Sequence, residues 1–350
     1  MSAVVQRFPT NHSVARFVLP HPHLLFLGDV VEAGFAKTAF GLRDWAGDRC
    51  IGEYALPGAK VSLGLAKLTP RAAAAQGARS MVIGVANVGG HIPPSWYGAL
   101  LEALEAGLDI VSGMHMRLAS LPGLQSAADR NNRRLIDVRT PPPGIPVASG
   151  LKRSGRRILT VGTDCALGKK YTALAITRGL KARQINATFR ATGQTGIMIA
   201  GEGMPLDSVV ADFIAGAAEV LSPNAPADHV DVIEGQGSIF HPSYAGVALG
   251  LLHGSQPDSF IVCHEPGRTH VLGHPEFALP SIEQVIEQTI ALGRLTNPGI
   301  RCAGVSLNTA KLDADEVLRE FVRVERRLSL PVADPMRGGA AFERLLDACE

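Results

Sequence analysis

The chain has 350 residues, of which 46% are hydrophobic and 19% charged, and this length and balance predict a compact protein of two domains. The formal net charge of +2 and an aromatic content of 5% argue against a nucleic-acid-binding surface. No stretch approaches the ~20 apolar residues of a membrane span, and the five scattered cysteines contain no C-x-x-C pair, so we expect a cytoplasmic protein without a disulfide framework or zinc ribbon.

Strands alternate with helices in the first part of the chain. Apolar runs at residues 23–27, 80–85 and 108–111 predict buried strands. Leucines and alanines at helical spacing predict a helix over residues 96–105. Because such alternation is typical of a parallel sheet, we expect a Rossmann-like domain over residues 1–140.

A proline-rich segment marks the boundary between the two predicted domains. Three consecutive prolines within Thr140–Pro146 cannot continue a helix or a central strand. A polar, basic stretch from Lys152 to Arg157 follows them. We therefore interpret residues 141–156 as a linker.

The alternation of strands and helices is stronger after the linker. Apolar runs predict strands at residues 157–161, 187–191, 229–234, 260–263, 303–307 and 331–333. Helices are predicted at residues 168–182 and from about residues 242, 281, 313 and 339. This pattern predicts an α/β fold, a doubly wound parallel sheet over residues 157–350, whose ligands bind at the carboxyl ends of the strands.

The loop after the first strand of the second domain is typical of phosphate-binding sites. Gly162 and Gly168 flank it and Lys169 begins the helix, so backbone N–H groups, a helix N-terminus and a lysine can meet at one anion. The usual motif has four residues between its glycines and a Ser or Thr after the lysine. Here five residues separate the glycines, and Lys170 replaces the hydroxyl that would bind Mg²⁺. The predicted cofactor-binding residues are Gly162, Thr163, Asp164, Cys165, Gly168, Lys169, Lys170, Tyr171 and Thr172.

Polar residues follow the second predicted strand of this domain. Arg190 ends that strand before a glycine-containing segment, and a guanidinium suits a carboxylate because it can bind two oxygens at once. An ion pair with Glu202 or Asp207 is the alternative for Arg190. We expect Arg190, Thr192, Gln194 and Thr195 to bind substrate beside the phosphate loop.

Candidate general bases lie after the third predicted strand. Glu234 ends this strand and could accept a proton from an amine, bind a metal or cap the next helix. His241 follows the loop, and a histidine titrates in the range that base catalysis needs. We predict Glu234 and His241 as catalytic residues, with Gln236, Ser238 and Arg268 in the substrate site. The spacing of His264, His270 and His274 matches no metal motif, so no metal is predicted.

Cys165 lies inside the phosphate loop, where the helix N-terminus and Lys169 favour a reactive thiolate. An acyl-cysteine intermediate is one interpretation. The preferred interpretation is a small side chain that fits a tight loop. Cys165→Ser is then expected to retain activity.

Three motifs occur in order along the chain: Gly162–Lys169, Arg190–Gly196 and Ile233–Ser238. Together they resemble the two-domain family typified by the D-glutamate N-acetyltransferase of bacterial D-amino-acid catabolism. The resemblance covers most of the chain, including Ala36–Thr38 and Gly89–Pro93. It implies a Rossmann-like N-terminal half and a C-terminal half similar to the P-loop NTPases.

The resemblance implies an acyltransferase that moves the acetyl group of acetyl-CoA to the amine of an acidic amino acid, with D-glutamate as the expected substrate. It also implies a homodimer. The extended loop and the Glu-Gly-x-Gly segment are similar to dethiobiotin synthetase, a P-loop enzyme that uses ATP. The alternative function is therefore an ATP- and Mg²⁺-dependent ligase or kinase, with Asp164, Thr172 or Glu234 holding the metal.

Overall fold

The computed structural model describes residues 15–350. By their contacts, the described residues form two compact units. The N-terminal unit contains Arg16–Pro141 and Ala191–Ser208, and the C-terminal unit contains Pro142–Arg190 and Val209–Glu350. The sequence pattern placed Ala191–Ser208 in the second domain, whereas this segment packs within the N-terminal unit.

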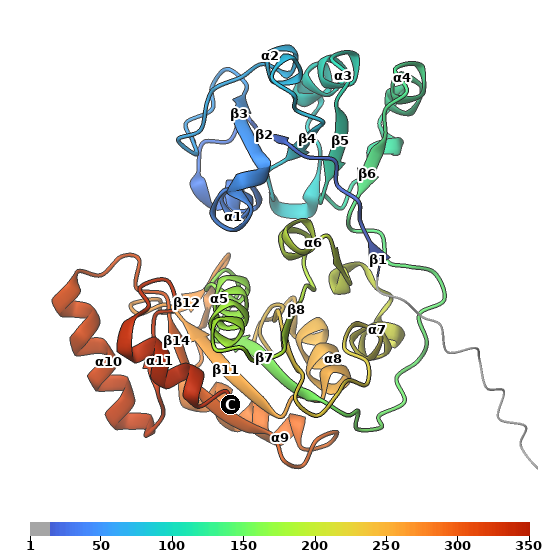
Figure 1. Ribbon diagram of the computed structural model, residues 1–350. Coiled ribbons are helices and arrows are strands. Elements are labelled where there is room, and N and C mark those ends of the chain that lie inside the picture. The colour runs from blue at the N-terminus through green and yellow to red at the C-terminus, as the bar shows by residue number, and fades with distance from the viewer. Residues whose placement is uncertain (1–14) are drawn as a thin grey trace, which may run out of the picture. The chain divides into compact units, whose positions relative to one another are not determined.

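A five-stranded sheet forms the centre of the N-terminal unit (Figure 1). Its order is β3-β2-β4-β5-β6, and every neighbouring pair is parallel. The strands are β2 (His23–Gly28), β3 (Cys50–Ala55), β4 (Ser80–Ile83), β5 (Asp109–Ser112) and β6 (Leu135–Asp137). The helices are α1 (Lys37–Trp45), α2 (Pro70–Ala75), α3 (Tyr97–Glu105), α4 (Leu124–Arg130) and α6 (Gln194–Ala200). The predicted Rossmann-like architecture is confirmed.

The core of the N-terminal unit forms around β2, all six residues of which are buried. Leu24 and Phe26 pack in one cluster with residues of α2, α3 and α4. The rings of Phe26 and Trp96 meet edge to face with centroids 5.4 Å apart. Trp96 also donates a hydrogen bond of 2.9 Å from Nε1 to Asp29, which fixes the chain just beyond the carboxyl end of β2.

Helix α6 connects the late segment of the N-terminal unit to its early part. It packs against α1. Thr195 Oγ1 donates to Thr38 Oγ1 at 3.1 Å, and both residues are buried. Ile197 and Met198 on the same helix are fully buried. This burial explains why the segment belongs to the N-terminal unit although it follows Arg190 without a break.

A six-stranded parallel sheet in the order β15-β14-β11-β7-β10-β8 forms the centre of the C-terminal unit. Its strands are β7 (Arg156–Gly162), β8 (Ala187–Arg190), β10 (Val230–Ile233), β11 (Ser259–His264), β14 (Arg301–Leu307) and β15 (Val332–Ala333). The predicted strands of the second domain are thus confirmed. The first of them, β7, lies between β10 and β11, so the strand order reverses there, and such a reversal is where these sheets bind ligands.

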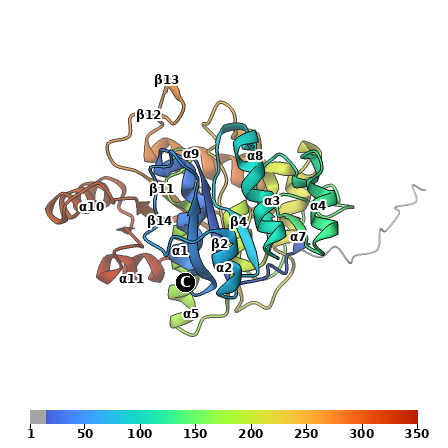
Figure 2. The ribbon, with the colours of Figure 1, turned by 90° about the horizontal axis from the view of Figure 1, so that it is seen from above.

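Helices cover this sheet in two layers (Figure 1). The helices are α5 (Lys169–Ala182), α7 (Ile214–Leu221), α8 (Ala245–Ser255), α9 (Ile282–Gly293), α10 (Ala314–Leu328) and α11 (Gly339–Asp347). Helices α5 and α11 contact each other and the sheet, while α7, α8 and α9 form a second contiguous group. A hairpin of β12 (His270–Val271) and β13 (His274–Ala278) projects from the unit (Figure 2).

The remaining elements are short. Strands β1 (Ala15–Arg16) and β9 (Glu202–Gly203) have two residues each. Turns of 3-10 helix occupy Ala33–Ala36, Gly47–Arg49, Val88–Gly90, Pro94–Trp96, Leu118–Ser120, Leu206–Ser208 and Ala211–Phe213. Among the helices of residues 15–350, none is both long and apolar enough to cross a membrane.

Candidate active site

The predicted phosphate loop connects β7 to α5, at the point where the strand order reverses. Its last residue, Gly168, has a φ of 103°, a conformation that L side chains rarely adopt. Ala166 within the loop also has a positive φ, of 55°. Helix α5 begins directly afterwards at Lys169, so the loop ends on a helix N-terminus, as an anion-binding loop requires.

A buried carboxylate holds this loop in place. Asp164 has no exposed surface and accepts hydrogen bonds from the backbone N–H groups of Cys165, at 2.6 Å, and Leu272, at 2.8 Å. Arg268 Nη1 lies 3.0 Å from Oδ2 of the same carboxylate. The loop is therefore fastened to the segment that follows β11, and the charge of Asp164 is paired.

Asp164 is the first of four charged side chains that alternate in sign and pair in sequence. Arg268 Nη1 also donates to the carbonyl oxygen of Cys165 at 2.9 Å, and Arg268 Nη2 forms an ion pair with Glu265. Lys311 Nζ lies 2.6 Å from the other oxygen of Glu265. Burial alone would raise the pKa of Glu265, but Lys311 and Arg268 outweigh it and hold that pKa below its usual value.

Lys169 is buried at the start of α5, and its Nζ donates to the carbonyl oxygen of Asp164 at 2.7 Å. Burial lowers the pKa of Lys169. Gly162 and Gly235 pack closely against it, because a Cβ on either would lie within 3.4 Å of the lysine side chain. The neighbouring Lys170 lies over the ring of Tyr171, with Nζ 5.2 Å from the ring centroid. The two lysines therefore differ in environment, one enclosed by the loop and one on an aromatic face.

Thr172 is the hydroxyl that the ATP-dependent alternative would use for Mg²⁺. Its Oγ1 lies 2.8 Å from Ser306 Oγ and 3.5 Å from Cys263 Sγ, in the buried interior beneath the loop. These contacts direct the hydroxyl toward β14 and β11. Lys170, in the position of the usual Ser or Thr, supplies no oxygen ligand.

His241 is buried beside the loop, and both of its ring nitrogens face polar groups. The backbone N–H of Ser243 donates to Nδ1 at 3.1 Å, so Nδ1 carries a lone pair and a neutral ring has its proton on Nε2. Nε2 lies 3.9 Å from Asp164 Oδ1. Burial lowers the pKa of His241, which favours this neutral form. The role of His241 as a general base stays a prediction, since accepting a proton requires one of these nitrogens to release its contact.

Asp164, Cys165 and His241 offer ligand atoms within 4.8 Å of one another, a group that could hold a metal. The guanidinium of Arg268 already contacts the Asp164 carboxylate and would repel a cation there. Asp164 also accepts two backbone N–H groups, which leaves little of its lone-pair capacity. The prediction that no metal binds therefore stays a prediction, with Arg268 as its physical argument.

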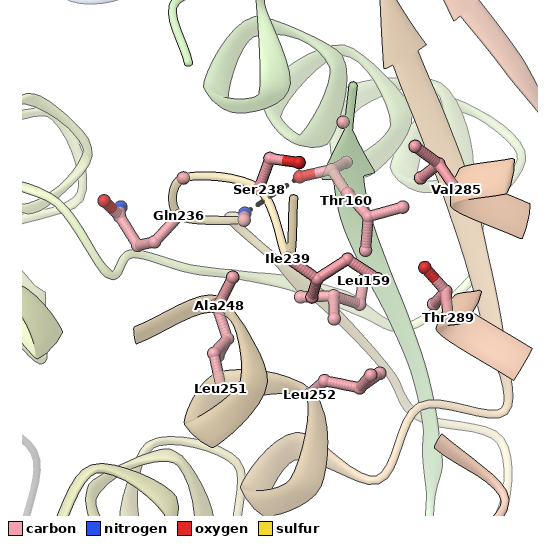
Figure 3. A pocket seen from close by; sticks show the side chains of 14 residues that line it. Leu159, Thr160, Gln236, Ser238, Ile239, Ala248, Leu251, Leu252, Val285 and Thr289 are labelled. Atoms are coloured by element: carbon pink, nitrogen blue, oxygen red, sulfur yellow. Dashed lines mark hydrogen bonds between the residues drawn. The ribbon is translucent and has the colours of Figure 1, made fainter. Parts of the chain in front are cut away.

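The loop after β10 closes over a small cavity of about 20 Å³ (Figure 3). Glu234 is buried at the start of this loop, and its backbone N–H extends the β10–β8 ladder by donating to Arg190. Gly235 donates to Thr160 Oγ1 at 2.9 Å. Gln236 and Ser238 line the cavity together with apolar residues of β7, α8 and α9. The loop predicted to supply oxyanion donors thus lies next to Lys169, at the carboxyl end of β7.

Arg190 has a different partner from those considered in the sequence. Its Nε donates to Asp231 Oδ1 at 2.7 Å. The fully buried Asp231 also contacts Ser222 Oγ at 2.6 Å and His229 Nε2 at 3.0 Å. The expected alternatives, Glu202 and Asp207, are not the partners. A substrate carboxylate at Arg190 stays a prediction, and it would have to compete with Asp231.

The other predicted substrate residues fall into both units. Gln236, Ser238 and Arg268 belong to the C-terminal unit, as does Arg190. Thr192, Gln194 and Thr195 belong to the N-terminal unit, where all three are buried. The buried Oε1 of Gln194 has no hydrogen-bond partner among the residues that the structure describes.

Sequence reasoning did not identify the ion-pair chain from Asp164 through Arg268 and Glu265 to Lys311. The signal for it was the segment Glu265–Arg268 directly after a predicted strand, at the same sheet edge as the phosphate loop. Its pairing with Asp164 could not be predicted from the sequence, because it depends on how two loops meet whose paired residues are 104 positions apart.

A central β7, a glycine-flanked loop and a lysine at the start of α5 define the C-terminal unit as a P-loop domain. Residues 146–346 match a family model described as "Domain of unknown function (DUF1611_C) P-loop domain". Residues 54–141 match "Domain of unknown function (DUF1611_N) Rossmann-like domain". The chain therefore belongs to the DUF1611 family.

Relatives match almost the whole chain. A protein of Tritonibacter scottomollicae named D-glutamate N-acetyltransferase is 49% identical over 93% of this chain and 98% of its own length. A Pseudoalteromonas protein of the same name is 45% identical over 91% of this chain and 96% of its own. A crystal structure of a DUF1611 family protein from Anabaena variabilis superimposes with a TM-score of 0.82 at 32% identity, covering 93% of this chain and 98% of that one.

Proposed function

We propose that this protein is a D-glutamate N-acetyltransferase that uses acetyl-CoA as the acetyl donor in the breakdown of D-amino acids. The observation that carries the proposal is the 49% identity, over nearly the full length of both chains, to a relative with this activity in its name. Because that match covers 93% of this chain, the similarity extends over both units and is not confined to the phosphate loop.

The phosphate loop supports a CoA-bound donor. A helix N-terminus, loop N–H groups and two consecutive lysines favour a polyanionic group such as the diphosphate of CoA. Lys170 replaces the hydroxyl that organises Mg²⁺ in nucleotide hydrolysis, and Thr172 is engaged by Ser306. The loop is thus better suited to binding a phosphate group that does not react than to cleaving one.

In the proposed reaction, the amine nitrogen attacks the thioester carbonyl and a C–N bond forms as the C–S bond breaks. The thiol of CoA leaves with a proton, and the amine gives up a proton to a base. Glu234 and His241 are the candidate bases in the C-terminal unit, both buried at the carboxyl edge of its sheet. Donors in the loop after β10, Gln236 and Ser238, would stabilise the developing oxyanion.

The experiment is a steady-state assay of CoA thiol release with D-glutamate, L-glutamate, D-glutamine and D-leucine. We expect the highest kcat/KM for D-glutamate, and mass spectrometry should identify N-acetyl-D-glutamate. Treatment with EDTA should leave the rate unchanged. Equal rates with D-glutamate and D-leucine, or no CoA release at all, would refute the proposal.

The same assay separates the ATP-dependent alternative. If Mg-ATP supports a reaction that EDTA abolishes, while acetyl-CoA neither reacts nor raises the melting temperature, the ligase or kinase is favoured instead. We also propose a cytoplasmic homodimer. Light scattering after gel filtration tests the oligomeric state, and cell fractionation tests the location.

A further inference from the structure

A polar cavity of about 220 Å³ lies in the N-terminal unit. It is formed by residues that follow β5, by the last residue of β6 and those that follow it, and by the last residue of the unit's later segment. Its volume is far above the roughly 10–15 Å³ that a single water needs. The side chains in its wall that carry the argument are His115, Arg117, Asp137 and Arg139.

Two guanidinium groups line this cavity, and neither is fully satisfied by the protein. The Arg117 side chain is exposed and, within residues 15–350, forms no hydrogen bond or ion pair, although its charge acts to lower the pKa of Asp137 against the larger effect of burial, which raises it. Arg139 Nη1 contacts Asp207 Oδ2 at 2.6 Å and His115 Nε2 at 2.5 Å, but its buried Nε has no hydrogen-bond partner there. Nε is enclosed by the protein, but the recorded contacts of Arg139 use only Nη1, so its other terminal nitrogen is the group that a ligand carboxylate would bind.

His115 adds no positive charge to this wall. Burial and the neighbouring Arg139 lower its pKa, so the ring is neutral near pH 7. A neutral ring can present a lone pair at Nε2 to the Arg139 guanidinium, which agrees with their short separation. The histidine therefore positions Arg139.

A carboxylate completes the wall. Asp137 ends β6 and accepts the backbone N–H of Leu118, with both oxygens at 3.2 Å. The charged groups that line the cavity are two guanidiniums and one carboxylate, and a second carboxylate, Asp207, pairs with Arg139 from outside the lining. An acidic amino acid carries the opposite set, two carboxylates and one ammonium. A phosphate group would match the arginines but would be repelled by Asp137.

We propose that this cavity is the amino-acid subsite of the enzyme, in which Arg117 and Arg139 bind the two carboxylates of an acidic amino acid and Asp137 accepts a hydrogen bond from its amino group. The inference rests on the proposed function for the identity of the ligand. The Rossmann-like unit would then supply substrate recognition.

The test is isothermal titration calorimetry of the full chain with D-glutamate, in the absence of any acetyl donor. Glutarate, which lacks the amino group, and D-alanine, which lacks the second carboxylate, are the comparison probes. Arg117→Gln is the main variant, since an exposed arginine without an ion pair can be replaced without disturbing the fold. Arg130→Gln, an exposed arginine at the end of α4, is the matched control.

Arg117→Gln should lower the affinity for D-glutamate and for glutarate by about tenfold or more, as expected for the loss of a charge-assisted contact. Asp137→Asn should lower the affinity for D-glutamate but not for glutarate, because only D-glutamate carries an ammonium group. D-Alanine should bind more weakly than D-glutamate to the wild type. Arg130→Gln should bind all probes as the wild type does, and melting curves should show that every variant is folded.

Two outcomes overturn the subsite. One is wild-type affinity for D-glutamate in Arg117→Gln and Asp137→Asn, and the other is the absence of any measurable binding of these probes to the wild type. If D-glutamate is acetylated with an unchanged KM in both variants, the subsite is wrong while the proposed function stands. If Arg117→Gln abolishes dicarboxylate binding in a protein that acetylates nothing, the subsite stands and the proposed function is wrong.

Discussion

The carboxylate of Asp164 joins two loops of the C-terminal unit, one after β7 and one after β11. From the phosphate loop, its Oδ2 faces Arg268 Nη1 at 3.0 Å, and it also accepts the backbone N–H of Leu272. Removing one member of a buried ion pair leaves the other charge without compensation. Asp164→Asn should therefore lower the free energy of unfolding by roughly 3 kcal/mol and weaken acetyl-CoA binding. Urea denaturation and calorimetry measure these effects. Asp228→Asn, an exposed loop position, is the control, and an Asp164→Asn protein as stable as the control would contradict the argument.

Two histidines, the buried His23 and the partly buried His264, make stability depend on pH. Burial lowers the pKa of His23 and of His264 to about 4, from the ordinary value of 6.5. Between those values the unfolded chain binds more protons than the folded one, so stability falls as the pH drops below 6.5 and the loss is complete near pH 4. Each histidine should make the free energy of unfolding about 2 kcal/mol lower at pH 5 than at pH 7.

Chemical denaturation at pH 7 and pH 5 measures this difference. Replacing His264 with Gln removes its titration while keeping a polar partner for Thr163, whose Oγ1 lies 3.0 Å from the histidine Nδ1. The variant should therefore lose less stability than the wild type between the two pH values. The same loss in both proteins would show that His264 is not buried in its neutral form.

At the scale of elements, the loop after β10 depends on the absence of a side chain at Gly235. A Cβ there would lie 1.6 Å from the carbonyl oxygen of Thr160, a backbone atom that cannot move without displacing β7. Gly235→Ala should therefore distort the edge of the sheet that carries the phosphate loop, with a clear fall in melting temperature and in kcat/KM. Gly246→Ala in α8 has no atom within 4 Å of the new Cβ and should cost neither stability nor activity. Comparable losses in both variants would contradict this account.

The sequence predicts elements well where burial is apolar and poorly where it is polar. The run at residues 23–27 is a buried strand because both faces of β2 are covered. Strand β3 was missed because Glu53 interrupts its apolar pattern. That glutamate is nevertheless buried, and it accepts hydrogen bonds from Ser62 Oγ at 2.7 Å and the Leu63 N–H at 2.6 Å. Local pattern carries no signal for such distant partners.

In the candidate site, too, some features could be predicted from the sequence and others could not. The phosphate loop was predictable, since its glycines, its lysine and the flanking strand and helix are all local features. The partner of Arg190 was not, because Asp231 lies on a neighbouring strand in the parallel sheet and alternates with apolar residues there. The arginines of the polar cavity were also missed, since β6 is short and only partly buried.

At the scale of the whole molecule, the N-terminal unit is built from two separate stretches of chain. Its second stretch, Ala191–Ser208, leaves the C-terminal unit after β8, contributes α6 and returns. Ile197 and Met198 of α6 are fully buried in the intact chain. A fragment ending at Pro141 therefore lacks part of its own core, and a fragment beginning at Pro142 carries apolar side chains whose packing partners are missing.

We expect the fragments 1–141 and 142–350 to associate when produced together, because burying α6 against α1 removes apolar surface from both. An affinity tag on one fragment should retain the other, and either fragment alone should be less soluble than the pair. Ile197→Asp places a charge at a fully buried position of α6 and should abolish the association. Ala200→Asp adds the same charge at the exposed end of that helix and should not. Separate fragments that stay soluble and do not bind each other would mean that Ala191–Ser208 is not part of the N-terminal core.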